Sequence, residues 1–114
     1  MWFTEEAGNK VGRIDLQGNI TEFPIPKSQE NVILASLSFD SVGSLWVQQY
    51  VDQNHPDPPG DDQIIRIDRK TQQLTSYTVP DRGTVMHRIT PGPDGNLWFT
   101  ELKTDRIGRI LREL

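Results

Sequence analysis

The groups best suited to chemistry in this sequence of 114 residues are one histidine and two glutamates. The neutral imidazole of His87 could act as a general base, taking a proton that lies next to a carbonyl polarised by a metal ion. The carboxylates of Glu5 and Glu101 could ligate magnesium, which prefers carboxylate and water oxygen. A carboxylate can equally cap a turn or pair with an arginine, so the elements that position these groups decide what they do.

A second group of chemically capable residues lies in the Pro-rich segment 51–62. Neighbouring Asp57, Asp61 and Asp62 could attract a calcium ion, but their spacing matches no established calcium loop. We therefore expect a solvated loop here, with His55 exposed in it.

Composition excludes several classes of function. The formal net charge is -4, so the long-range field would repel phosphate backbones and anionic membrane surfaces, and neither nucleic acid nor a membrane is an expected partner. No stretch approaches the length of a membrane helix, and the first residues lack the pattern of a signal peptide. The absence of cysteine fits both a cytosolic and a secreted protein. We expect a soluble, cytoplasmic protein and leave secretion open.

The chain repeats itself, which is its most informative feature. Trp2, Trp46 and Trp98 begin the same short motif at spacings of 44 and 52 residues. Three further blocks recur in register with it. The four blocks are residues 1–5, 45–49 and 97–101; 10–15, 63–68 and 106–111; 20–26 and 74–80; and 37–44 and 89–96. The second copy is the longest because it carries the insertion at 51–62.

Each block is short, rich in β-branched and aromatic residues, and bounded by turn residues, which is typical of strands. Apolar and polar residues alternate in 11–15 and 65–68, as in a strand with one buried face. Four antiparallel strands per repeat predict the blades of a β-propeller. The prediction is an all-β fold with an incomplete ring.

The predicted blades divide the chain into three repeats within one partial propeller unit, residues 1–114. Approximate boundaries are 1–31 without its first strand, 32–82, and 83–114 without its last strand. Such an arrangement leaves strand edges and a sheet face open, which natural proteins avoid because they recruit partners. We therefore expect head-to-tail self-association, or completion by the blades of a longer chain.

Two sets of recurring residues have structural interpretations. Strict recurrence of the tryptophans predicts packing between blades, with Trp46 and Trp98 mostly buried. Arginines recur in register as well, and we expect them to pair with the acidic residues of the repeat. The recurring residues are Trp2, Trp46 and Trp98, and Arg13, Arg66 and Arg109.

The segments GPDGNLWFTE at 92–101 and RIGRI at 106–110 resemble the blade signature of the virginiamycin B lyase family, also called streptogramin lyases. WFTE at 2–5, GNKVGRI at 8–14 and TEFPIP at 21–26 extend the resemblance over most of the chain, with the second repeat the most diverged. The resemblance implies a closed propeller of about seven blades. It also implies that enzymes of the family open a cyclic depsipeptide antibiotic by magnesium-assisted elimination.

The resemblance also implies roles for particular residues. His87 falls on the innermost strand of its repeat, where the family can carry a catalytic histidine, and Glu101 follows 14 residues later at an acidic, metal-binding position. The preceding repeat has Ala35 and Gln49 at these two positions, and Val85 stands where a further acidic ligand is expected. The implied metal site is therefore incomplete in this chain.

Two hypotheses of function follow. The first is a propeller module that is non-catalytic alone, needs no cofactor, completes its ring by self-association, and serves as a binding or scaffold unit, with a small-molecule ligand left open. The second is a magnesium-dependent streptogramin B lyase, a carbon–oxygen lyase that acts only in a complete ring.

Overall fold

The computed structural model describes residues 1–5, 8–27, 29–40, 43–68, 70–71 and 73–111. Within these ranges the chain forms ten strands, all paired antiparallel, and no helix, so it contains no helix that could cross a membrane. The prediction of an all-β fold built from short antiparallel strands is confirmed.

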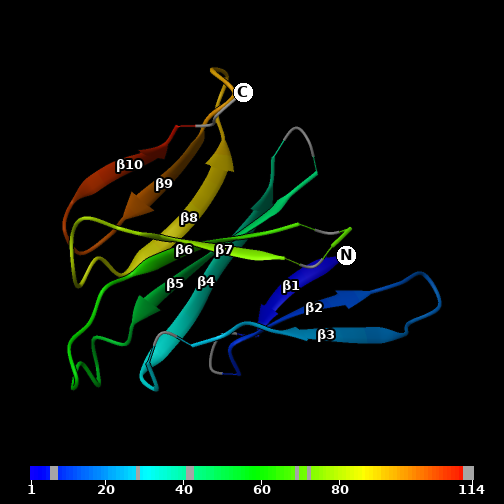
Figure 1. Ribbon diagram of the computed structural model, residues 1–114, viewed down its shortest axis with the longest axis horizontal. Coiled ribbons are helices and arrows are strands. Elements are labelled where there is room, and N and C mark those ends of the chain that lie inside the picture. Colours follow the sequence, from blue (N-terminus) through cyan, green and yellow to red (C-terminus); the bar gives the residue numbers. More distant parts are fainter. Residues whose placement is uncertain (6–7, 28, 41–42, 69, 72, 112–114) are drawn as a thin grey trace.

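The strands form three sheets that stand side by side (Figure 1). The first sheet contains β1 (Trp2–Glu5), β2 (Lys10–Ile14) and β3 (Ile20–Pro24). The middle sheet contains β4 (Val32–Phe39), β5 (Leu45–Val51), β6 (Gln63–Ile67) and β7 (Leu74–Thr78). The last sheet contains β8 (Met86–Pro91), β9 (Leu97–Glu101) and β10 (Arg106–Ile110). Strand β4 contacts β1 on one side and β8 on the other, so the middle sheet joins its two neighbours.

Alternation along β5 explains how one sheet can pack on both sides. Leu45 and Val47 lie in a buried cluster with Val11 of the first sheet, whereas Trp46 lies in a second cluster with Met86 of the last sheet. The chain therefore has two cores, one at each interface between sheets.

Each recurring tryptophan lies beneath the arginine that faces it across the sheet. The distances from guanidinium carbon to ring centroid are 5.8 Å for Arg13 and Trp2, 6.0 Å for Arg66 and Trp46, and 5.2 Å for Arg109 and Trp98. The expected pairing with acidic residues of the repeat is found for Arg109, whose guanidinium lies 3.5 Å from Asp94. The cross-strand partners of the three arginines are the tryptophans, and a cation over an indole face is an attractive contact.

Burial differs among the tryptophans. Trp46 is only 4% exposed because the last sheet covers it, as the sequence predicted. Trp98 is less buried than Trp46 and belongs to neither of the two buried clusters between sheets. The cause is its position: Trp98 lies on the outward face of the last sheet, where no further sheet of the described chain packs.

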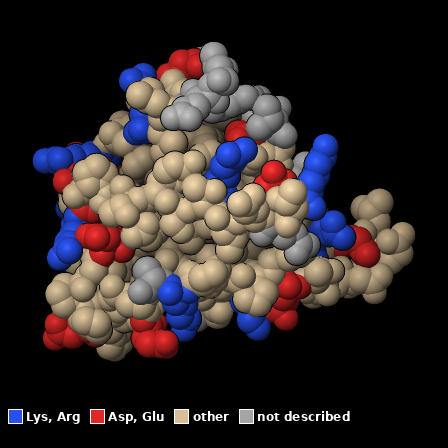
Figure 2. Space-filling model, in the orientation of Figure 1, with Lys and Arg blue, Asp and Glu red and all other residues tan. Residues whose placement is uncertain are grey.

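Charged side chains of both signs are dispersed over one face of the molecule (Figure 2). On the face shown in Figure 2, basic and acidic groups alternate around a centre that is mostly uncharged. No patch of a single sign dominates this face.

Candidate functional site

His87 lies on β8 at an irregularity that occurs twice in the chain. The pairing register shifts between Met86 and Ile89, as it does between Leu34 and Leu37 in β4. Such bulges redirect side chains and are frequent next to functional sites. His87 is exposed, and none of the described residues makes a hydrogen bond or ion pair with its ring.

The middle sheet fixes the backbone at this irregularity. Ser36 Oγ accepts a hydrogen bond from the amide of Ile89 at 3.0 Å and donates one to Gln48 Oε1 at 3.0 Å. The side-chain amide of Gln48 donates to the carbonyl of Arg88 at 2.8 Å. Sequence analysis did not identify Ser36 and Gln48, because their role depends on contacts between repeats and leaves no local motif.

Glu101 ends β9 directly opposite Met86, the residue before His87. Its side chain is 5% exposed, and its Oε1 is buried without a hydrogen-bond partner among the described residues. Burial raises the pKa of Glu101, and the nearby carboxylates of Asp81 and Asp62 raise it further. The carboxylate thus lies in the interface with the middle sheet, close to two other acids.

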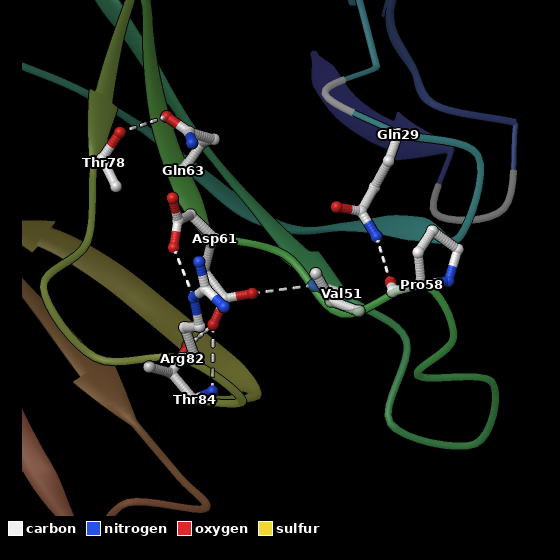
Figure 3. A network of polar contacts seen from close by, with 9 residues as sticks. Gln29, Val51, Pro58, Asp61, Gln63, Thr78, Arg82 and Thr84 are labelled. Carbon is white, nitrogen blue, oxygen red and sulfur yellow. Dashed lines mark hydrogen bonds and ion pairs between the residues drawn. The ribbon is translucent and has the colours of Figure 1, made fainter.

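The two acids at the end of the insertion are engaged in structural contacts (Figure 3). Asp62 is fully buried, and its carboxylate accepts hydrogen bonds from the amide of Val51 at 2.8 Å and from the amide and hydroxyl of Thr84 at 2.9 and 2.6 Å. Asp61 pairs with Arg82 at 2.7 Å. Both carboxylates therefore hold the segment that precedes β8 against the middle sheet.

The rest of the insertion folds back on the segment before β4. Gln29 donates to the carbonyl of Pro58 at 2.5 Å, and Asn31 donates to the carbonyl of His55 at 2.7 Å (Figure 3 shows the first contact). His55 is exposed and lies 3.3 Å from Asp52. Within the described ranges no three His, Asp or Glu side chains gather in a way that could hold a metal ion, and this includes the acids of the insertion.

Glu5 lies in the first sheet, away from the other candidates. Its carboxyl group hydrogen-bonds with Glu22, which raises the pKa of Glu5. Glu22 also pairs with Lys10 at 3.8 Å. The structure therefore does not bring Glu5 and Glu101 together into one site.

The donors around Glu101 do not fit a complete magnesium site. Magnesium prefers several oxygen ligands in near-octahedral geometry. Asp62 is committed to Val51 and Thr84, Val85 offers no oxygen from its side chain, and the equivalent of Glu101 in the middle sheet is Gln49. The Gln49 amide donates to Asn9 Oδ1 at 3.0 Å. At the interface between the first and middle sheets this repeat position therefore holds a neutral hydrogen-bonding residue, whereas at the interface between the middle and last sheets it holds the acid Glu101.

A cavity of about 620 Å³ lies between the first and middle sheets. Apolar and aromatic side chains form most of its wall, and Arg13 is the one charged residue that lines it. Its lining residues are Trp2, Val11, Arg13, Thr21, Phe23, Pro24, Ile25, Leu45, Ile67 and Leu74. His87 and Glu101 are not among them. Sequence analysis missed the cavity because it is a gap between two repeats.

The chain consists of antiparallel sheets of up to four strands, and the middle sheet packs one face on the first sheet and the other face on the last. This arrangement defines a segment of a β-propeller. A sequence model of the virginiamycin B lyase family matches residues 1–113. The chain belongs to the virginiamycin B lyase family.

Two solved structures share this arrangement. A streptogramin B lyase structure matches with a TM-score of 0.74 and 30% sequence identity over 96% of this chain. A catalytically inactive histidine-to-alanine variant of virginiamycin B lyase from Staphylococcus aureus, with quinupristin, matches with a TM-score of 0.73 and 33% identity over 96% of this chain. The chain spans 33% of the length of each of these proteins. No curated protein matches it.

Proposed function

We propose that this chain is a binding or scaffold segment of a β-propeller ring and does not catalyse a reaction by itself. The observation that carries the proposal is the different environment of the two candidate groups, one buried and one exposed. Glu101 is buried beside Asp62 and Asp81, whereas His87 is exposed with no described acid bonded to its ring. A general base next to a metal-polarised carbonyl would need both groups to face one substrate.

Ring completion by further sheets is part of the proposal, and equivalent positions support it. Val11 and Ile64 are 0% and 1% exposed because the next sheet covers them, whereas their equivalent Ile107 is 71% exposed on the last sheet. Exposed apolar faces of this kind mark association sites. The covering sheets come from other copies of the chain or from further sheets of a longer polypeptide.

A small molecule would bind in the cavity between the first and middle sheets. Its mostly apolar wall, with Arg13 as the one cation, suits an apolar ligand that carries an anionic group. Nucleic acid and membranes are not proposed partners, since the net charge is -4 and the viewed face has no basic patch.

A second candidate function is magnesium-dependent opening of a streptogramin B ring by a complete propeller. It is favoured by the exposed position of His87 on a bulged strand and by the likeness to two solved lyases. The metal ligands besides Glu101 would then have to come from other sheets.

The two functions are distinguished by incubating the purified chain with a streptogramin B antibiotic, with and without magnesium. We expect no ring opening. Magnesium-dependent opening that is lost in His87→Ala would overturn the non-catalytic proposal. Sedimentation velocity at micromolar concentration tests ring completion, for which we expect an oligomer. A folded, soluble monomer would contradict self-association.

A further inference from the structure

The cavity between the first and middle sheets has two walls of different chemistry. The first sheet contributes the rings of Trp2 and Phe23, which stack with centroids 5.6 Å apart and an interplanar angle of 25°. The middle sheet contributes only aliphatic side chains, those of Leu45, Ile67 and Leu74. The volume of about 620 Å³ falls within the range of small-molecule sites, about 300–1,000 Å³. A ligand in this cavity would therefore lie between a partly aromatic and an aliphatic surface.

The cavity lies towards the outer strands of the two sheets. Phe39 of β4, at the other end of the middle sheet from β7, packs edge-on against Trp2, with centroids 5.9 Å apart and an interplanar angle of 74°. Phe39 does not line the cavity, whereas Thr21 and Phe23 of β3 and Leu74 of β7 do. Both of these outer strands are described and paired with their neighbours. The cavity therefore does not depend on the open edge at β10.

Arg13 brings a positive charge to the aromatic wall. Its cross-strand neighbours are Trp2 in β1 and Thr21 in β3, and all three side chains line the cavity. The guanidinium carbon lies 5.8 Å from the Trp2 ring centroid. A guanidinium presents its donors in a planar fork that matches a carboxylate, and a threonine hydroxyl can donate one more hydrogen bond. The two side chains therefore offer a place for an anionic group beside the aromatic wall.

Both walls favour a rigid, flat apolar body over a flexible chain. An aromatic ring gains offset stacking on an aromatic wall in addition to the apolar area that it buries. A flexible alkyl chain also buries area, but it gains no stacking and loses rotational freedom on binding. Arg13 and Thr21 are exposed, so an acidic group beside them would remain partly hydrated while the ring is buried. These features together suit a ring system with an acidic group at its edge.

We propose that this cavity is a binding site for a planar aromatic acid. The ring lies between Phe23 and Leu74, and the carboxylate pairs with Arg13 beside the hydroxyl of Thr21. The inference rests on the proposed binding function and specifies the class of ligand. It requires neither of the candidate catalytic groups, because neither lines the cavity. A cationic ligand would be repelled by Arg13, the one charged residue among the described residues of the lining.

The test uses naphthoate, a planar aromatic acid, and isothermal titration calorimetry with the intact chain. The two comparison compounds are naphthylmethanol, which lacks the charge, and octanoate, which lacks the ring. We expect naphthoate to bind about tenfold more tightly than naphthylmethanol, because the alcohol loses a hydrogen-bonded ion pair. Naphthoate should bind about fivefold more tightly than octanoate, because the alkyl chain does not stack.

Methyl chemical shifts locate the bound compound. Ring currents of the naphthyl group should shift the methyl resonances of Leu45, Ile67 and Leu74, and the imidazole resonances of His87 should not move. Binding without these methyl shifts would overturn the site. Equally tight binding of octanoate, with shifts at the same methyl groups, would overturn the aromatic class of ligand and leave the proposed binding function in place. No binding of any of the three compounds would overturn both.

Matched variants of the chain test the two parts of the site. Arg13→Gln should weaken naphthoate binding about tenfold and leave naphthylmethanol unchanged, whereas Arg109→Gln, the equivalent change over Trp98, should alter neither. Thr21→Phe places a bulky side chain at the cavity wall and should abolish binding, whereas Thr75→Phe, at the equivalent exposed position of β7, should not. Circular dichroism checks that all four variants are folded. Unchanged naphthoate binding to Arg13→Gln or to Thr21→Phe would overturn the proposal.

Discussion

The ring of Phe99 lies directly over Gly108, its cross-strand neighbour in β10, and occupies the space that a Cβ atom at position 108 would need. Phe3 lies over Gly12 in the same way in the first sheet. The middle sheet has Val47 and Ile65 at these two positions. One large and one absent side chain in the outer two sheets thus fill a space similar to that filled by two medium-sized side chains in the middle sheet. Close-packed interiors tolerate substitutions that conserve the total side-chain volume in this way.

We predict that Gly108→Ala lowers the free energy of unfolding by about 1–3 kcal/mol, because the added methyl group must displace the Phe99 ring. The double variant Phe99→Val with Gly108→Ile reproduces the pair of the middle sheet. It should be more stable than the sum of the single changes predicts, since contacting residues are not additive. Urea denaturation measures both effects.

The matched control is Gly8→Ala, where the nearest atoms to an added Cβ lie at 3.6 Å and the backbone is not left-handed. Its effect should stay within about 0.5 kcal/mol. Additive losses in the double variant would show that the two positions do not share volume.

Replacing each tryptophan by alanine should distinguish a tryptophan that packs between two sheets from one that lies on an open sheet face. We expect Trp46→Ala to cost about 3–5 kcal/mol, as other large core deletions do, because Trp46 is 4% exposed between two sheets. Trp98→Ala should cost clearly less, since one face of Trp98 has no sheet over it. Thermal melts of the two variants provide the comparison, and equal losses would mean that Trp98 is covered in solution.

Sequence predicted the sheets well because their signals are local. The alternation in 65–68 and the turns around it are visible without knowledge of the fold, and β6 is found where the repeat requires a strand. The repeat itself indicated that each sheet must pack against a similar one. Period, strand order and fold class follow from these features.

The candidate site was less predictable because it depends on which face of a strand meets which neighbour. The sequence shows that Glu101 recurs with Glu5 and Gln49, but not that this position faces the preceding sheet. Likewise, the recurrence of Arg109 does not show that its cross-strand partner is Trp98. Both are set by contacts between residues far apart in sequence, which a local pattern does not record.

Asp94 should make the stability of the last sheet depend on acid pH. Hydrogen bonds from the Trp98 indole at 3.1 Å and from Asn96 lower the pKa of Asp94 from its usual 3.8 to about 2. A lowered pKa means that the folded state favours the carboxylate. Its contribution is therefore present above about pH 4 and is lost as the pH falls towards about 2.

The test compares melting temperatures of the wild type and Asp94→Asn across this range. We expect the variant to be less stable at pH 6 and the difference to shrink as Asp94 becomes protonated in the wild type. A difference that does not change with pH would show that the hydrogen bonds, not the charge, account for the loss.

Glu101→Gln should stabilise the chain at neutral pH. Burial and the nearby Asp81 raise the pKa of Glu101, so the folded state favours the protonated form, and the cost of the charge grows as the pH rises above its usual value of 4.5. Glutamine already fills the equivalent position 49, where its amide donates two hydrogen bonds. We expect a gain of about 1 kcal/mol at pH 7 that shrinks near pH 4, measured by urea denaturation. Glu30→Gln, which removes an exposed charge, should change stability by less than about 0.5 kcal/mol. A loss of stability in Glu101→Gln at pH 7 would show that the ionised carboxylate has a favourable partner, such as a bound cation.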